Sequence, residues 1–158
     1  MVINAVVFDM DGLMLDTEPL YKQAWQSGCR ELGYELTDGT YTTLVGRPTP
    51  ACEKVLLDTF GSRFPLDAFR ARWPERWRQS AATDGIHIKP GLMPLLDFLR
   101  SRGIPTAVAT SSEAAFADFS LGRAGLLDAF QTVVTGGSDR TREALARHLS
   151  GGGPSTRC

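Results

Sequence analysis

The chain has 158 residues, of which 42% are hydrophobic and 22% charged, which predicts a globular protein with its own core and excludes a disordered chain. Its formal net charge of -1 gives no electrostatic reason to expect nucleic acid or an anionic membrane as a partner, and no apolar run approaches the ~20 residues that span a bilayer. The three cysteines are odd in number and widely spaced, which favours a reducing cytoplasm over a disulfide framework, and the first residues lack the features of a secretion signal.

The N-terminal part of the chain predicts one strand and one helix. Val2–Phe8 is rich in β-branched residues and almost lacks polar alternation, as in a strand that is buried on both faces. Thr17 then offers an N-cap, Leu20–Leu32 follows as a helix, and Gly33 is placed to end it. Within this helix, Cys29 is expected to be a packed thiol rather than a nucleophile.

The helical pattern continues through the next segment, most clearly over Ala51–Thr59 and Leu66–Arg78. Phe69, Trp73 and Trp77 recur at every fourth position and form one stripe of the second helix. Such a stripe is more typical of packing in a core or at a domain interface than of a ligand site.

Alternating elements begin at Pro90–Gly91. Two β-rich runs, Thr106–Thr110 and Gln131–Thr135, flank a helix over residues 113–123, for which Ser112 offers a cap. A further helix before the first run is predicted by leucines at helical spacing, at positions 92, 95, 96 and 99. The order of strand, long helical excursion, helix, strand, helix and strand predicts an α/β fold with a parallel sheet and crossover helices.

Two carboxylates, Asp9 and Asp11, directly follow the first predicted strand. In open parallel sheets, ligands bind at the carboxyl ends of the strands, and Gly12 eases the tight loop on which the pair lies. Two anions this close favour a divalent cation between them, and hard oxygen ligands suit Mg²⁺. One carboxylate can then attack phosphorus while the other moves protons. Taken alone, the spacing is more typical of an acidic turn at the end of a strand, so the interpretation depends on the surrounding residues.

The string FDMDGLMLDTE, which starts at Phe8, resembles motif I of the haloacid dehalogenase (HAD) superfamily. Its continuation, LDTEPL, is similar to the subgroup that contains β-phosphoglucomutase, phosphoglycolate phosphatase and pseudouridine-5′-phosphatase. The string TAVATSS over Thr106–Ser112 resembles motif II, in which a strand ends in a Thr or Ser that hydrogen-bonds the transferring phosphoryl group. Without motif I, Ser111 and Ser112 would be interpreted as helix caps only. On these motifs, residues 1–136 are identified as similar to this superfamily.

The resemblance implies a fold and a domain organisation. Residues 1–14 and 83–136 would form an incomplete Rossmann-like HAD core with a partial parallel sheet, which is an α/β fold. Residues 15–82 would form an inserted α-helical cap. Residues 137–158 would be an atypical tail outside the native core.

The resemblance also implies roles for the site residues. Asp9 would be the nucleophile that forms an aspartyl-phosphate, and Asp11 would protonate the leaving oxygen and later activate water. Mg²⁺ would bind the Asp9 carboxylate and the Asp11 backbone carbonyl. Thr110 and Ser111, with the amides that follow them, would hold the phosphoryl group.

A third string, LVGRPTP over Leu44–Pro50, resembles the substrate-specificity loop of the subgroup. Gly46 would let the backbone approach the site, and Arg47 would bind a distal anion or hydroxyl groups of the substrate. An exposed arginine in a proline turn is the equally weighted alternative. Glu18 would help to position the substrate or the cap.

Together, these motifs predict a Mg²⁺-dependent phosphohydrolase that acts on a small phosphorylated metabolite similar to a sugar phosphate. A phosphosugar mutase is the close alternative, in which the aspartyl-phosphate passes to a sugar hydroxyl instead of to water. The alternative of another class is a catalytically impaired remnant that binds phosphometabolites weakly or only self-associates.

Two further elements of the family have no counterpart in this sequence. Motif III is a lysine after the third strand, whereas the lysines here, Lys22, Lys54 and Lys89, all precede motif II. Motif IV is an acidic pair at the end of a fourth strand, and neither the pair nor an apolar strand follows Thr135. Without later strands, the first strand would be an exposed apolar edge, which favours pairing with another chain.

The composition changes near Gly136, since the remainder carries four arginines and only two acidic residues, Asp139 and Glu143. We therefore put forward the hypothesis that a frameshift near Gly137 replaced the native continuation. The test is to translate the coding DNA in its two other frames, one of which is expected to encode GKPxP and a later acidic pair. If neither frame does so, the frameshift hypothesis is wrong.

Overall fold

The computed structural model describes residues 3–136, so the predicted tail and its frameshift lie outside the described residues. The chain divides into two compact units. The first, the core unit, comprises Met1–Asp16 and Ile86–Cys158, and the second, the inserted unit, comprises Thr17–Gly85. The insertion expected over residues 15–82 has nearly the same bounds, and its action as a cap stays a prediction.

The core unit contains a parallel sheet of three strands in the order β1-β2-β3. These strands are β1 (Val6–Phe8), β2 (Thr106–Glu113) and β3 (Thr132–Gly136). The register pairs Phe8 with Val108 and Val108 with Val133. The predicted α/β fold with a partial parallel sheet is therefore confirmed.

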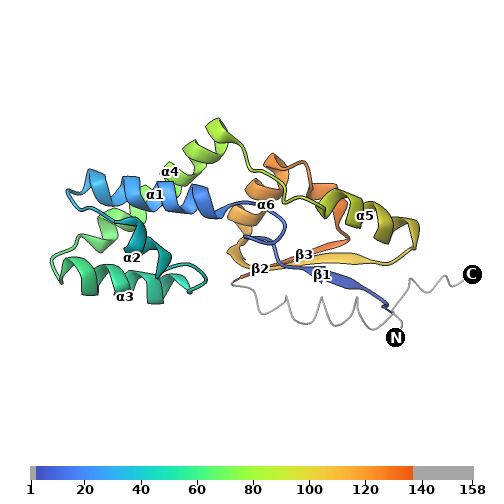
Figure 1. The fold of residues 1–158 in the computed structure, drawn as a ribbon, viewed down its shortest axis with the longest axis horizontal. Coiled ribbons are helices and arrows are strands. Elements are labelled where there is room, and N and C mark those ends of the chain that lie inside the picture. Colours follow the sequence, from blue (N-terminus) through green and yellow to red (C-terminus); the bar gives the residue numbers. More distant parts are fainter. Residues whose placement is uncertain (1–2, 137–158) are drawn as a thin grey trace, which may run out of the picture. The chain divides into compact units, whose positions relative to one another are not determined.

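Two helices and one short turn of 3-10 helix (Leu127–Ala129) accompany the sheet. Figure 1 shows α5 (Leu92–Ser101) and α6 (Ala114–Arg123) on the same side of it. Successive right-handed crossovers that advance across a sheet in one direction place their helices on one face. The inner face of α5 buries three of its predicted leucines, at positions 92, 96 and 99.

Several boundaries in the core unit differ from the sequence-based prediction, and β3 lies one residue later than expected. The strand β1 begins at Val6 rather than at Val2. The strand β2 continues past Thr110 to Glu113, so the N-cap position of α6 is Glu113. The predicted helix cap at Ser112 is therefore wrong, because Ser112 is still part of the strand.

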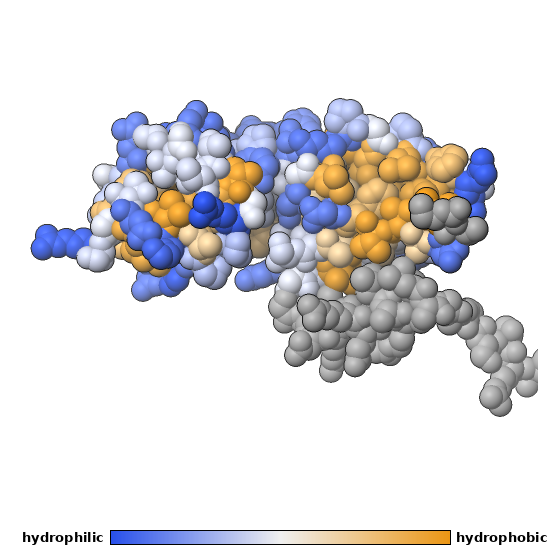
Figure 2. Space-filling model, turned by 60° about the horizontal axis from the view of Figure 1, so that its bottom comes forward, coloured by the Kyte–Doolittle hydropathy of each residue, from blue (hydrophilic) through white to orange (hydrophobic). Residues whose placement is uncertain are grey.

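Large apolar side chains gather on the exposed surface of the core unit, as the right-hand part of Figure 2 shows. In the described part of the sheet, β1 is an edge strand, and Val7 within it is 39% exposed. Self-association through this edge stays a prediction. The other exposed apolar residues of this unit are Ile3, Leu13, Met93, Leu95, Phe98 and Leu127.

The inserted unit is helical throughout. Its helices are α1 (Glu18–Glu31), α2 (Asp38–Thr42), α3 (Thr49–Phe60) and α4 (Leu66–Asp84). The helices expected from the sequence are present, and α4 runs beyond the predicted end at Arg78 with Pro74 inside it. Between residues 3 and 136, no helix combines the length and the apolar character that crossing a membrane requires.

The aromatic stripe of α4 packs against α1, which confirms its prediction as core packing. The ring of Trp25 on α1 meets Phe69 edge-on at 5.1 Å between centroids, and Tyr21 lies 5.5 Å from Trp77. Gly28 on α1 makes room for this contact, since a Cβ there would lie 3.3 Å from the Phe69 ring. Phe69 and Trp77 are fully buried, so the seam between α1 and α4 is part of the core of this unit.

We expect Phe69→Ala to lower the free energy of unfolding of the inserted unit by about 3–5 kcal/mol, because it leaves a cavity in a closely packed aromatic seam. All three tryptophans, Trp25, Trp73 and Trp77, lie in this unit, so urea denaturation followed by tryptophan fluorescence reports on it alone. The exposed Val45→Ala in the same unit is the control and is expected to change stability by less than about 0.5 kcal/mol. Similar losses for both variants would contradict the assignment of this seam as the core.

Candidate active site

The loop that follows β1 holds the first pair of candidate residues. Its backbone closes on itself, since the amides of Met14 and Leu15 both donate to the carbonyl of Met10 at 3.1 Å. Gly12 adopts a φ of +76° within this turn, a conformation that glycine adopts without strain. The side chain of Met10 is completely buried and anchors the loop. The exposed Asp9 and the half-buried Asp11 therefore lie on either side of the anchored Met10, at the carboxyl end of β1.

Asp11 contacts hydroxyl groups on the neighbouring strand. The Thr110 hydroxyl lies 3.4 Å from Asp11 Oδ2, and the Ser112 hydroxyl donates to the same oxygen at 2.6 Å. The amide of Ser112 in turn donates to the Thr110 hydroxyl at 3.0 Å. Parallel pairing of β1 with β2 thus brings together the two predicted motifs, which lie in the two separate segments of the core unit.

Ser112 is the residue that the sequence-based analysis missed as part of this site. Both hydroxyl groups approach the same oxygen of Asp11, so the side chains of Thr110 and Ser112 point to the same side of β2. Ser111, which lies between them in the sequence, is exposed. An eight-residue strand through Glu113, rather than one ending at Thr110, would have revealed the pairing of the two hydroxyl groups.

The donor set of this loop suits a hard cation. Asp9 and Asp11 supply oxygen only, which matches Mg²⁺ rather than a soft metal. Within residues 3–136, no three His, Cys, Asp or Glu side chains are grouped closely enough to form a complete metal site. Mg²⁺ commonly uses one or two carboxylates and takes its other ligands from water and phosphate, so two aspartates are compatible with it.

Each lysine of this chain forms an ion pair with an acidic side chain other than Asp9 and Asp11. Lys89 contacts Asp16 with 2.7 Å between Nζ and Oδ1, inside the core unit. Their segments also pair through the backbone, since the amide of Asp16 donates to the carbonyl of His87 at 2.8 Å. In the inserted unit, Lys22 and Lys54 pair with acidic side chains, Asp38 and Asp58 respectively.

The three predicted substrate-binding residues lie in the inserted unit. Glu18, half-buried at the start of α1, lies 3.5 Å through Oε2 from the hydroxyl of Tyr41. Burial and the neighbouring Glu18 raise the pKa of Tyr41, so this hydroxyl stays protonated and can donate. Gly46 and Arg47 are exposed on the loop between α2 and α3. Their roles stay predictions.

The thiol of Cys52 contacts the loop between α2 and α3, where it donates to the carbonyls of Leu44 at 3.4 Å and of Arg47 at 3.5 Å. The side chain of Cys52 is buried. The thiol has one proton and is a weak donor, so the turn is held mainly by the amide of Arg47, which donates to the Leu44 carbonyl at 3.1 Å. Arg47 itself is exposed. The loop therefore presents Arg47 from a fixed backbone.

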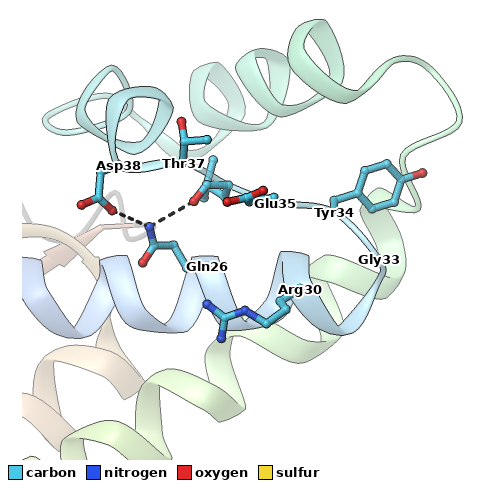
Figure 3. A pocket seen from close by; sticks show the side chains of 8 residues that line it. Gln26, Arg30, Gly33, Tyr34, Glu35, Thr37 and Asp38 are labelled. Atoms are coloured by element: carbon cyan, nitrogen blue, oxygen red, sulfur yellow. Dashed lines mark hydrogen bonds between the residues drawn. The ribbon is translucent and has the colours of Figure 1, made fainter.

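A hollow of about 620 Å³ opens elsewhere in the inserted unit, beside the C-terminal half of α1 (Figure 3). The amide of Gln26 crosses it and donates to the Leu36 carbonyl at 3.0 Å and to Asp38 Oδ1 at 2.8 Å. Hydrogen bonds from Lys22 and then from Gln26 lower the pKa of Asp38. None of the predicted site residues lines this hollow, and its polar groups tie the loop after α1 to the helix.

Comparison with known proteins gives consistent results. The family model for haloacid dehalogenase-like hydrolases matches residues 3–151. A phosphorylated carbohydrates phosphatase of Thermotoga maritima is 30% identical over 134 residues, which are 85% of this chain and 62% of that protein. A phosphoglycolate phosphatase of Rhodobacter capsulatus is 32% identical over 143 residues, 88% of this chain and 64% of that protein.

Among solved structures, a protein assigned as a β-phosphoglucomutase from Thermotoga maritima has a TM-score of 0.74 and 27% identity. The match covers 93% of this chain and 71% of that structure. The chain spans about three fifths of the length of the curated relatives that it matches.

Neither described cysteine is placed to act as a nucleophile. Cys29 is fully buried in α1, which confirms a packed thiol, and burial raises its pKa to about 12. Burial also raises the pKa of Cys52, and the nearby Arg47 offsets this only in part. Both thiols are therefore expected to stay protonated and unreactive in the folded unit.

We expect iodoacetamide at pH 8 to modify Cys29 and Cys52 only after unfolding in guanidinium, as measured by mass spectrometry of the labelled peptides. Since the unfolded thiols ionise near a pKa of about 8.5 and the folded ones do not, the free energy of unfolding should fall as the pH rises above about 9. Rapid labelling of Cys29 in the native chain would contradict its burial.

Proposed function

Because the chain belongs to the haloacid dehalogenase-like hydrolases, we propose that it is a Mg²⁺-dependent phosphohydrolase that works through an aspartyl-phosphate. The observation that carries this proposal is the contact of Asp11 with Thr110 beside the exposed carboxylate of Asp9. A nucleophile, a proton carrier and a phosphate ligand are then all present at one edge of the sheet.

In the first half-reaction, the Asp9 carboxylate attacks phosphorus and forms a P–O bond while the bond to the leaving oxygen breaks. Asp11, entering in its protonated form, gives its proton to that oxygen, so the alcohol leaves neutral. In the second half-reaction, Asp11 takes a proton from water, and the water oxygen displaces Asp9 from phosphorus. Inorganic phosphate leaves, and both aspartates return to their starting states.

Around the transferring phosphoryl group, we assign Thr110 and Ser111 as ligands. Thr110 is the last buried residue of β2. The backbone amides of the residues between Thr110 and the start of α6 follow it. Mg²⁺, held by the Asp9 carboxylate and the Asp11 carbonyl, would supply positive charge against the phosphate when bound. These groups orient the phosphorus toward Asp9 and lower the electrostatic cost of bringing two anions together.

For the substrate, we propose a small phosphorylated metabolite of the sugar-phosphate kind. Support comes from the relative in Thermotoga maritima, which is a phosphatase of phosphorylated carbohydrates. Gly46, Arg47 and Glu18 of the inserted unit would then select the part of the substrate away from the phosphate. Arginine suits this role because its planar fork binds carboxylate or phosphate oxygens in pairs.

A phosphosugar mutase is the second candidate, and the solved structure from Thermotoga maritima that is assigned as a β-phosphoglucomutase favours it. The two reactions share the aspartyl-phosphate and differ in whether water or a sugar hydroxyl accepts the phosphoryl group. An impaired remnant is the third, because Lys22, Lys54 and Lys89 pair with Asp38, Asp58 and Asp16 rather than with Asp9 or Asp11. Release of inorganic phosphate indicates a phosphohydrolase, an isomerised sugar phosphate indicates a mutase, and the absence of turnover indicates an impaired remnant.

We expect Asp9→Asn to lower kcat for p-nitrophenyl phosphate in Mg²⁺ by about 10³-fold or more, because an amide oxygen is too weak a nucleophile to form the intermediate. The release of p-nitrophenolate and of inorganic phosphate measures the turnover of both chains. Removing Mg²⁺ with EDTA is expected to abolish the activity of the unsubstituted chain as well.

Asp58→Asn is the matched control, since Asp58 is an exposed aspartate in an ion pair with Lys54. It is expected to turn over at the unsubstituted rate. Equal rates for the unsubstituted chain and Asp9→Asn would refute catalysis through Asp9.

A further inference from the structure

The strand β2 is irregular where it passes the candidate site. Its pairing with β3 is regular as far as Ala109↔Val134 and resumes only at Glu113↔Gly136. Between these two pairs, β2 advances by four residues and β3 by only two, so Thr110–Ser112 form a β-bulge. Bulges bend a strand locally and re-aim its side chains, and they are frequent beside active sites.

Gly136 makes this bulge possible. A Cβ built on Gly136 would collide with the carbonyl oxygen of Ser111 and would lie 2.9 Å from its carbonyl carbon. The two backbones therefore approach each other too closely for any residue with a side chain. The close approach fixes the position of the bulge along β2, and with it the direction of the side chains at Thr110 and Ser112.

The bulge gives the two hydroxyl groups different strengths of contact with Asp11. From Ser112, the distance to Oδ2 is 2.6 Å, at the short end for a hydroxyl donor to a carboxylate. From Thr110 it is 3.4 Å, longer than an ordinary hydrogen bond between oxygens. Of the two hydroxyl groups, that of Ser112 therefore makes the closer contact with the Asp11 carboxylate, and Thr110 remains able to donate to a phosphoryl group.

We propose that Ser112 is a positioning residue that holds the Asp11 carboxylate in the orientation for proton transfer. This inference rests on the proposed function of Asp11 as the acid and base of a phosphohydrolase. A hydroxyl suits the task because it donates to a carboxylate and can rotate to accept from a carboxylic acid. Ser112 can therefore keep its contact with Asp11 both before and after the proton transfer.

The alternative is that Ser112 only stabilises the bulge. A purely structural role predicts that its removal slows all phosphate esters by the same factor. A role through Asp11 predicts that the loss of rate is larger for esters whose leaving oxygen is more basic, because those esters depend more on protonation by Asp11. Phenolate is a more basic leaving group than p-nitrophenolate, so phenyl phosphate and p-nitrophenyl phosphate form a pair of similar shape that separates the two cases.

The experiment compares kcat and KM of the full chain and its variants for both esters in Mg²⁺. For Ser112→Ala we expect kcat on phenyl phosphate to fall about tenfold or more, part of the 10²–10⁴-fold that a positioned acid supplies. On p-nitrophenyl phosphate the fall should be about threefold or less, and KM should stay within about twofold for both esters. Ser112→Thr keeps the hydroxyl and should restore the rate on phenyl phosphate.

Two further variants complete the design. Ser101→Ala is the matched control, because Ser101 is an exposed serine at the end of α5 whose hydroxyl donates to the Phe98 carbonyl at 2.7 Å. It should behave as the unsubstituted chain does. Gly136→Ala displaces the bulge and should reproduce the ester-dependent loss of Ser112→Ala, with far-UV circular dichroism reporting that the chain is folded.

Equal losses on the two esters, no loss on either, or failure of Ser112→Thr to restore the rate would each overturn the role of Ser112. Asp9→Asn is measured beside these variants. If it is inactive while Ser112→Ala matches the unsubstituted chain, only the present inference fails. If Asp9→Asn is as active as the unsubstituted chain, or if neither ester is turned over, the proposed function fails and the role of Ser112 with it.

Discussion

The parallel pairing of β1 with β2 is the constraint on which the candidate site depends. Phe8 lies opposite Val108, so the residues that follow each of them emerge at the same edge of the sheet. Asp11 and Thr110 are 99 positions apart in the sequence and come into contact only for this reason. A slip of one residue would turn every side chain of β1 to the opposite face of the sheet and would separate the hydroxyl groups from the carboxylate.

Much of the fold could be predicted from local patterns. Several elements have apolar residues at the spacing of one type of secondary structure, and burial of such residues favours that structure directly. These elements are the β-branched run before Asp9, the leucines of α5 and the aromatic stripe that ends at Trp77. The pairing of strands followed from their order along the chain. The contact between Asp11 and Thr110 was implied by the resemblance of two separate motifs.

The role of Ser112 could not be predicted in the same way. Local propensity favours a serine before a helix as its cap, and nothing within a few residues opposes that interpretation. What keeps Ser112 in the strand is the approach of Gly136, which lies on another strand and has no side chain. The end of α4 was also missed, since Ala81, beyond the predicted end at Arg78, is buried although the segment around it is mostly polar.

The paired segments at the border of the core unit have an evolutionary consequence. The amide of Asp16 reaches the carbonyl of His87, and Lys89 closes the same junction through its ion pair with Asp16. The chain therefore leaves and re-enters the core unit at neighbouring points, and α5 alone completes the crossover from β1 to β2. Any segment whose two ends lie close together can be spliced into that junction without altering the register of the sheet. Changes to the inserted unit can thus accumulate independently of the core unit that carries the aspartates.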